Sequence, residues 1–151
     1  MSGPGADPRL AALYQEVILD HYRRPRNKGA LAEPTGAASL RNPLCGDEVD
    51  VQVEVREGRV AEVRFGGRGC SISQASASMM TELVKGHTAE EVQALGERFA
   101  AMIRGDAEAA SDKALGQARA LSGVARFPTR VRCALIAWEA MARAVKSAGA
   151  G

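Results

Sequence analysis

Three cysteines and one aspartate are the side chains of this chain best suited to chemistry. The cysteines are Cys45, Cys70 and Cys133, and an odd number of thiols cannot all pair as disulfides, which favours metal ligation or thiol chemistry. Asp47 adds a carboxylate two residues after the first thiol, and Gly46 between them lets the backbone turn tightly enough for both side chains to face one ion. Three sulfurs and one oxygen suit tetrahedral zinc, and iron–sulfur chemistry also uses thiolates.

The local setting of the thiols favours their ionised form. Cys45 is expected on a loop, whereas Cys70 and Cys133 are expected near the N-termini of two helices, where free N–H groups stabilise an anion. Arg68 and Arg132 flank two of the thiols and act in the same direction. We therefore expect all three thiolates to be exposed and in electropositive surroundings. No C-x-x-C motif occurs, so the site can assemble only when the whole domain folds.

A simpler interpretation exists for each residue. A single cysteine is commonly a small buried hydrophobe, and Asp47 can serve only to hold a turn. The Gly-rich approach to Cys70 and the Cys-Gly-Asp triplet together favour a site. His21 at a helix end and His87 in a turn are interpreted as cap or surface residues rather than ligands.

Three other features of the sequence are interpreted as structural. The basic run Arg23-Arg-Pro-Arg-Asn-Lys28 is typical of a solvated helix end, and its functional alternative is a docking patch for an acidic partner. Met79-Met80 and Trp138 are interpreted as core residues.

The elements that must position these side chains follow from hydrophobic spacing. Helical spacing predicts a helix over residues 10–22 that ends before Pro25. A short strand over 38–42 is followed by a hairpin, in which valines alternate with polar residues from Val49 and the chain turns at Glu57-Gly58. The second strand of the hairpin is expected over 59–65 and to be broken by Gly66-Gly-Arg-Gly69.

The rest of the chain is predicted to be helical. A helix capped at Ser71-Ile-Ser73 is expected to run to about Lys85 and stop at Gly86. A capping box at Thr88-Ala-Glu-Glu91 opens the next helix, which runs to about Arg104. Residues 105–124 are less regular, with one short helix over 113–121, and Pro128 opens the last helix. Strands followed by helices predict an α+β domain with a small antiparallel sheet of about three strands and helices on one face.

Composition excludes several classes of protein. The 151 residues fit one domain at 9–147, with a disordered tail at 1–8 and a frayed end at 148–151. A 4% aromatic content and a net charge of +2 argue against a nucleic-acid partner. No apolar run approaches the ~20 residues of a membrane span, and the first residues do not resemble a signal peptide. With free thiols, these features predict a cytoplasmic protein without a membrane partner.

Three motifs resemble those of one family. Tyr22-Arg-Arg-Pro-Arg-Asn27, Cys45-Gly-Asp47 and Phe65-Gly-Gly-Arg-Gly-Cys70-Ser-Ile-Ser-Gln-Ala-Ser-Ala-Ser-Met79 are similar to the NifU N-terminal/IscU/SufU family of iron–sulfur cluster assembly proteins. The resemblance covers the chain apart from its two tails. It implies a small antiparallel sheet with helices on one face, and a cysteine desulfurase and a downstream cluster scaffold or apo iron–sulfur proteins as partners. It also implies metal ligation by Cys45, Asp47, Cys70 and Cys133.

Departures from the scaffold pattern point to the SufU branch. Arg132 stands where IscU-type scaffolds usually have histidine, and 105–124 resembles an insertion that they lack. The chaperone motif Leu-Pro-Pro-Val-Lys is reduced to Phe127-Pro-Thr-Arg130, so recognition by a dedicated Hsp70 system is not expected.

The resemblance implies a zinc-binding carrier of persulfide sulfur. A partner group would take the coordination place of Cys45, freeing this thiolate to accept sulfur from the desulfurase, while Arg132 would favour the anionic persulfide. The alternative is a scaffold that assembles a [2Fe–2S] cluster on Cys45, Cys70 and Cys133 and transfers it to apo-proteins. A purely structural zinc module is a third reading. The resemblance thus leaves open a zinc-dependent sulfurtransferase or a non-enzymatic scaffold.

Overall fold

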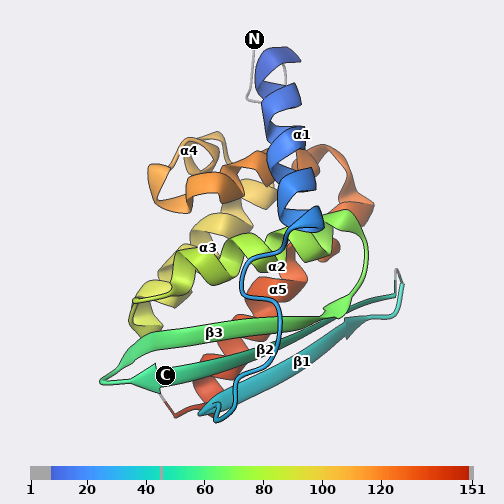
Figure 1. Ribbon diagram of the computed structural model, residues 1–151. Coiled ribbons are helices and arrows are strands. Elements are labelled where there is room, and N and C mark those ends of the chain that lie inside the picture. The colour runs from blue at the N-terminus through green and yellow to red at the C-terminus, as the bar shows by residue number, and fades with distance from the viewer. Residues whose placement is uncertain (1–7, 45, 150–151) are drawn as a thin grey trace.

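A computed structural model describes residues 8–44 and 46–149 and shows a three-stranded antiparallel sheet with helices packed on one face (Figure 1). The strands are β1 (Gly36–Asn42), β2 (Asp47–Arg56) and β3 (Arg59–Arg68), paired in the order β1-β2-β3. The predicted α+β class and the number of strands are therefore confirmed.

Helices of very different length make up the rest of the fold. They are α1 (Pro8–Arg23), α2 (Ser71–Val84), α3 (Ala89–Ile103), α4 (Ala107–Ala110), the 3₁₀ helix η1 (Lys113–Arg126) and α5 (Pro128–Ser147). The capping box of Thr88 and Glu91 is confirmed, because each side chain accepts a hydrogen bond from the other residue's backbone N–H. The first helix begins at Pro8, inside the predicted tail, and residues 1–7 and 150–151 lie outside the described part.

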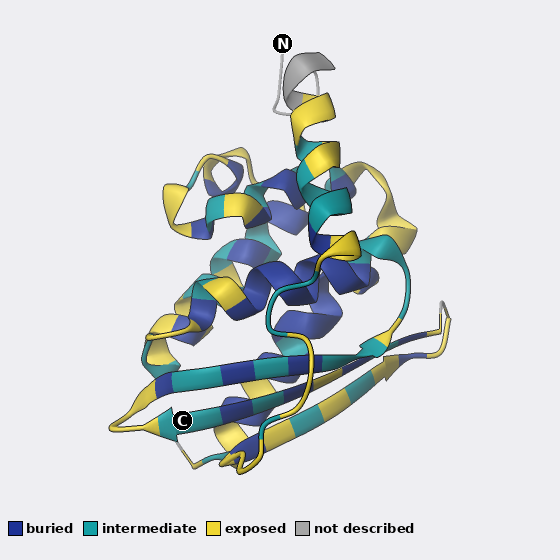
Figure 2. Cartoon of the chain, viewed as in Figure 1, coloured by how far each residue is buried: buried dark blue, intermediate teal, exposed yellow. Residues whose placement is uncertain are grey.

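The alternation of the strands decides which face of the sheet is covered. Val49, Val51 and Val53 are fully buried under the helices, while Asp50 on the other face is exposed (Figure 2). Helices α2 and α5 pack on this buried face. Met79, Met80 and Trp138 are buried as predicted, and the Trp138 ring stacks on Phe99 with 5.2 Å between ring centroids. The core therefore lies between the sheet and these helices.

Strand β3 continues through the glycines that were expected to break it. Gly67 pairs with Val49, and Arg68 pairs with Glu48. Gly67 has a positive φ of 113°, and a Cβ there would lie 2.1 Å from the carbonyl oxygen of Glu48. Only glycine lets the two backbones approach so closely, so the Gly-Gly pair extends the strand to the site instead of ending it.

The 105–124 segment is more ordered than predicted. It forms α4 and then η1, which reaches Arg126 and changes direction at Gly116 (φ 50°). Leu115 and Leu121 are fully buried in the core. An insertion-like segment therefore supplies part of the packing that holds α1, α2, α3 and α5.

His21 is not the cap or surface residue that the sequence suggested. It is fully buried, with Nδ1 2.7 Å from Ser78 Oγ on α2 and Nε2 2.6 Å from Gln117 Oε1 on η1. An amide oxygen can only accept, so Nε2 carries the proton. This buried imidazole ties α1 to two elements far away in sequence. His87 is half-buried in a turn beside Glu91, as expected.

Candidate metal centre

Three of the four predicted ligands meet at one end of the sheet. The ligand atoms of Asp47, Cys70 and Cys133 all lie within 4.8 Å of one another. Asp47 begins β2, Cys70 is the N-cap residue of α2, and Cys133 lies in the second turn of α5. The fourth predicted ligand, Cys45, lies outside the described residues, in the chain between β1 and β2.

The Asp47 carboxylate is positioned by the start of α2. Its Oδ1 accepts a hydrogen bond of 3.0 Å from the backbone N–H of Cys70 and one of 3.2 Å from the hydroxyl of Ser73. Asp47 is fully buried, so these bonds offset part of the cost of burying a carboxylate. They also hold the aspartate beside Cys70. Ser73 is thus a positioning residue rather than part of a side-chain cap, because the N-cap residue makes no side-chain cap bond.

Gly69 leaves the room that this arrangement needs. A Cβ at this position would lie 2.3 Å from Asp47 Oδ1 and 2.6 Å from Ser73 Oγ. The sequence showed the glycine-rich approach to Cys70, but the reason for Gly69 becomes visible only when the aspartate arrives from another strand. The same holds for Ser73, whose only signal was its position three residues after a cysteine.

The expected exposure of the thiols is wrong for the two that are described. Cys133 is fully buried and Cys70 is half-buried. Cys133 faces the core because the helix that carries it packs on the sheet and on α2. Cys70 keeps partial access to solvent because it caps a helix at the edge of the core.

In the structure, the two arginines that flank Cys70 and Cys133 in sequence each pair with a glutamate. Arg68 Nε lies 3.7 Å from a carboxylate oxygen of Glu48, and an Arg132 N–H donates to Glu139 at 3.1 Å. Both arginine side chains are mostly exposed. Their charges therefore lie at the rim of the centre, where water weakens them.

The residues present fit a thiophilic metal. Two sulfurs and a carboxylate oxygen converge in a mostly buried place, and a tetrahedral zinc site with bonds of about 2.3 Å brings its ligand atoms to about 3.8 Å from each other. The observed upper limit of 4.8 Å needs only a small contraction. A hydrogen-bonded aspartate is the orienting arrangement expected around a metal ligand.

Two large apolar side chains close in sequence to the candidate ligands are exposed. Leu44, which precedes Cys45, is 94% exposed, and Phe127, which precedes α5, is 59% exposed.

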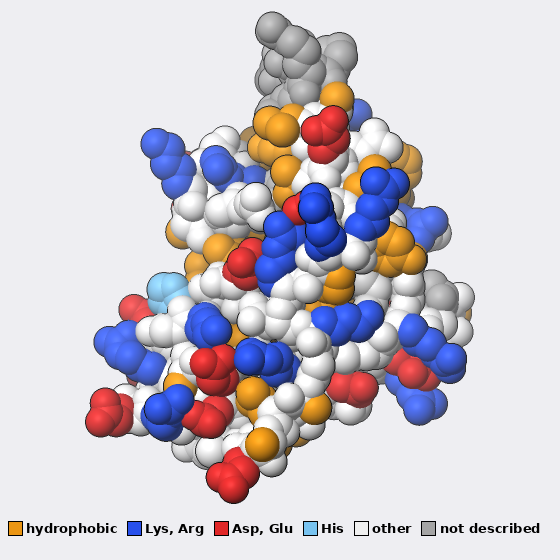
Figure 3. Space-filling view, viewed as in Figure 1, with side chains coloured by type: hydrophobic (Ala, Val, Ile, Leu, Met, Phe, Trp, Pro, Cys, Tyr) orange, Lys and Arg blue, Asp and Glu red, His pale blue; other side chains and the backbone are white. Residues whose placement is uncertain are grey.

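The predicted docking run lies at the end of α1. Arg24 and Arg26 both bind the Asp20 carboxylate, and their hydrogen bonds lower the pKa of Asp20, with Arg26 the larger cause. Arg26 is also held through its backbone, which donates to Ser78 Oγ. In Figure 3, Lys and Arg side chains gather below the end of α1. The run is thus partly internal structure, and Arg23 and Arg24 are its exposed members near the helix end.

The fold and the centre define a small α+β protein with a candidate metal site of two cysteines and one aspartate, built from three separate segments. Residues 13–134 match the NifU-like N-terminal domain. The chain belongs to this family, and its relatives include iron–sulfur cluster assembly proteins named IscU and SufU.

Relatives of both names cover nearly the whole chain. The chain is 42% identical to the iron–sulfur cluster assembly scaffold protein IscU of Streptococcus pyogenes serotype M1, over 91% of this chain and 86% of the relative. It is 40% identical to the zinc-dependent sulfurtransferase SufU of Bacillus subtilis (strain 168), over 90% of this chain and 91% of the relative.

Solved structures share the fold. A NifU-like N-terminal protein of Brucella abortus has a TM-score of 0.82 at 26% identity, covering 90% of this chain and 94% of its own. A putative SUF-system scaffold protein of Fervidobacterium islandicum AW-1 has a TM-score of 0.80 at 29% identity, covering 89% and 97%. Among the described residues, no helix combines the length and apolar character needed to cross a membrane.

Proposed function

We propose that the protein is a zinc-binding sulfur carrier, which takes persulfide sulfur from a cysteine desulfurase and passes it on for cluster assembly in the cytoplasm. The observation that carries this proposal is the convergence of Asp47, Cys70 and Cys133 within 4.8 Å. The similarity to a relative named as a zinc-dependent sulfurtransferase supports it. A carboxylate ligand also suits an exchangeable site better than an inert one, where thiols and imidazoles dominate.

Zinc bound at this centre would keep its thiol ligands deprotonated. Asp47 and Cys133 are buried and fixed by strand and helix backbone, so they hold the site. Cys45 belongs to the connection between β1 and β2, next to Gly46 with its positive φ of 75°. We therefore assign the holding role to Cys70, Cys133 and Asp47, and the accepting role to Cys45.

The transfer is a thiol exchange at the terminal sulfur of the donor. The Cys45 thiolate attacks the outer sulfur of the desulfurase persulfide and forms a new S–S bond, while the donor S–S bond breaks and its thiolate leaves. The terminal sulfur moves without a net change in oxidation state. Arg132 is proposed to stabilise the resulting anionic persulfide, for which it would exchange its exposed ion pair with Glu139.

The second candidate is a scaffold that assembles a [2Fe–2S] cluster on Cys45, Cys70 and Cys133. The 42% identical relative named as a cluster scaffold favours it. Anaerobic reconstitution with iron and sulfide distinguishes the two. Visible absorption of a stable cluster would support the scaffold, whereas a colourless protein that retains zinc would support the carrier.

The purified protein should contain about one zinc per chain, because the ligand set provides one tetrahedral site. Cys70→Ser should lose most of this zinc by elemental analysis. Chelation should lower the melting temperature, since a site that forms only on folding contributes its binding energy to stability. Asp47→Asn should also lower the zinc content, and its matched control is Asp50→Asn, because Asp50 lies on the same strand but on its exposed face. Zinc-free wild type, or unchanged zinc in Cys70→Ser, would contradict the proposal.

The exposed end of the basic run should contribute to desulfurase binding. Arg23→Glu with Arg24→Glu should weaken association several-fold at low salt and much less at high salt, because exposed charges steer encounter and are screened. Calorimetry at two salt concentrations measures the effect. Arg104→Glu, an exposed charge at the end of α3, is the control. Equal affinity of the double variant and the control at low salt would leave the run as a solvated helix end.

A further inference from the structure

The two edge strands of the sheet differ in how many hydrogen bonds they receive from other segments. The edge of β3 is covered at both ends, because Phe65 exchanges backbone hydrogen bonds with Asn27 and Gly29, and Val60 with Gly86 and His87. Such cover prevents an edge strand from pairing with another chain. The other edge strand, β1, receives cover at one point only among the described residues, where the Ser147 hydroxyl contacts Ala37.

The ladder shows which groups of β1 remain outside. The N–H and C=O of Ala37 both point outward to Ser147, and in an antiparallel strand the direction of these groups alternates with every residue. The backbone groups of Ser39 and Arg41 must therefore also point outward. Both residues are exposed, and the structure gives their outward groups no backbone partner among the described residues. This open part of the edge is the part nearest the metal centre.

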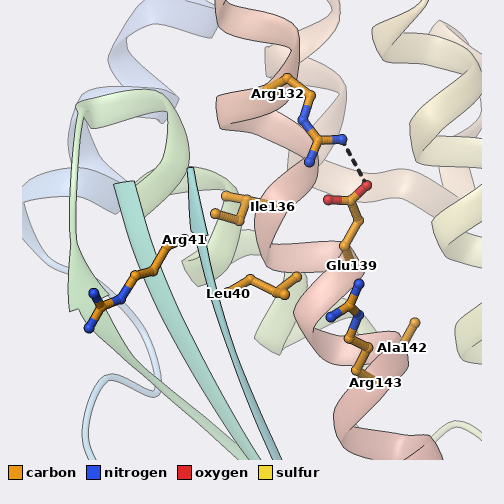
Figure 4. A pocket seen from close by; sticks show the side chains of 7 residues that line it. All are labelled: Leu40, Arg41, Arg132, Ile136, Glu139, Ala142 and Arg143. Carbon is orange, nitrogen blue, oxygen red and sulfur yellow. Dashed lines mark hydrogen bonds and ion pairs between the residues drawn. The ribbon is translucent and has the colours of Figure 1, made fainter. Parts of the chain in front are cut away.

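A hollow of about 470 Å³ lies beside this open edge, between β1 and α5 (Figure 4). Leu40 from the strand faces Ile136 from the helix across it. The full lining is Leu40, Arg41, Arg132, Ile136, Glu139, Ala142 and Arg143. A strand added to the edge of β1 would place alternate side chains in this hollow, as strand addition requires.

The charged residues around the hollow indicate which kind of segment would bind there. Of the three arginines that line it, Arg41 pairs with Glu48 and Arg132 with Glu139, and Arg143 has no acidic partner among the described residues. Arg143 lies along the same side of α5 as Arg132, whereas the Arg41 side chain points away from the hollow and is 79% exposed (Figure 4). An acidic segment would complement these charges, and an apolar residue within it would pack against Leu40 and Ile136.

The hollow and the basic run approach the centre from different sides. The hollow begins at Arg132, next to the ligand Cys133 on α5, whereas the basic run contacts α2 through Arg26 and Ser78. A carrier must meet one protein to receive sulfur and another to deliver it. Two separate surfaces that flank one centre suit these two encounters.

We propose that the open edge of β1 and the hollow beside it bind an extended, acidic segment of the protein that accepts sulfur from this carrier. The segment pairs with the backbone of Ser39 and Arg41 and places its carboxylates near Arg132 and Arg143. This inference rests on the proposed carrier function, because it assigns the second partner of the same site.

A defined peptide tests the surface without knowledge of the acceptor. The probe is acetyl-Glu-Val-Glu-Leu-Asp-Val-Glu-amide, added to the ¹⁵N-labelled full chain and followed by amide chemical shifts and amide hydrogen exchange. Binding should shift the Ser39, Leu40 and Arg41 amides and slow exchange at Ser39 and Arg41, whose N–H groups would gain a partner. The same peptide with lysine in place of its acidic residues should bind at least about tenfold more weakly, because every charge contact reverses.

Three variants separate the parts of the surface. Ser39→Pro removes an outward N–H without removing a bond to β2, which edge strands tolerate, and should reduce binding of the acidic peptide. Arg132→Glu with Arg143→Glu should reduce it at least about tenfold, since two attractions become repulsions. Arg56→Glu, an exposed arginine at the far end of β2, should leave the affinity unchanged. Circular dichroism checks that each variant is folded.

The outcomes distinguish this inference from the carrier proposal. Ser39→Pro should retain zinc and desulfurase stimulation while losing peptide binding, which supports a separate second surface. Shifts confined to the basic run, equal binding of the lysine peptide, or full binding by Ser39→Pro would each overturn the inference and leave the carrier proposal intact. Loss of desulfurase stimulation in Ser39→Pro together with peptide binding would instead assign the edge to the sulfur donor and also overturn it.

Discussion

Gly69→Ala should lower the zinc affinity of the protein about 10- to 100-fold, the range typical for loss of a group that orients a metal ligand. The new Cβ would lie 2.3 Å from Asp47 Oδ1 and 2.6 Å from Ser73 Oγ. Both are ends of side chains, so they can rotate away without moving the backbone. The rotation that relieves the overlap also removes the aspartate from the position that Cys70 and Ser73 fix.

The matched control is Gly66→Ala, three residues earlier on β3. A Cβ at Gly66 would lie 3.8 Å from Asp50 Oδ2, which is an ordinary contact. A competition titration with a chromophoric chelator gives the zinc affinity, and circular dichroism confirms the fold. Equal affinities of the two variants would mean that the position of Asp47 does not determine metal binding.

Cys45→Ser should abolish stimulation of the cysteine desulfurase while the fold persists. Serine cannot form a persulfide, and the position belongs to a connection between strands rather than to the buried core. A thiol on such a connection can move toward a partner, whereas Cys133 would have to move α5 with it, and Cys70 caps α2. Far-ultraviolet circular dichroism is the check that the variant is folded.

Mass spectrometry can identify which cysteine carries the transferred sulfur. After reaction with the desulfurase and cysteine, the peptide that contains Cys45 should gain about 32 Da, the mass of one sulfur atom. Cys133→Ser should lose metal, so this variant tests metal binding rather than the acceptance of sulfur. The added mass on the Cys133 peptide would reverse the two roles.

Local patterns in the sequence predicted the elements of the fold well. The valine alternation of β2, the capping box at Thr88 and the proline at the start of α5 depend on neighbouring residues, and each is confirmed. Gly67 was misread because a glycine pair that breaks a strand and one that lets two strands approach look the same in one chain. The approach of Glu48 from β2 decides between them.

The same limit applies to the candidate centre. The residue types and motifs indicated Asp47, Cys70 and Cys133, and the fold brings them together. The burial of Cys133 was misjudged, because a helix N-terminus is exposed only if nothing packs over it, and α5 packs into the core. The prediction for His21 was wrong for a related reason, since its partners Ser78 and Gln117 lie 57 and 96 residues away in the sequence.

The position of Cys133 on the last helix has a consequence for how the centre is loaded. A ribosome releases the chain from its N-terminus, so Asp47 and Cys70 emerge long before the third ligand. Helix α5 also supplies much of the contact with β1, β2 and α2. The full set of candidate ligands and the helix that packs behind them therefore exist only after α5 has been synthesised. We therefore expect metal to bind only after α5 has emerged, and a nascent chain that lacks α5 would present thiols without a complete site.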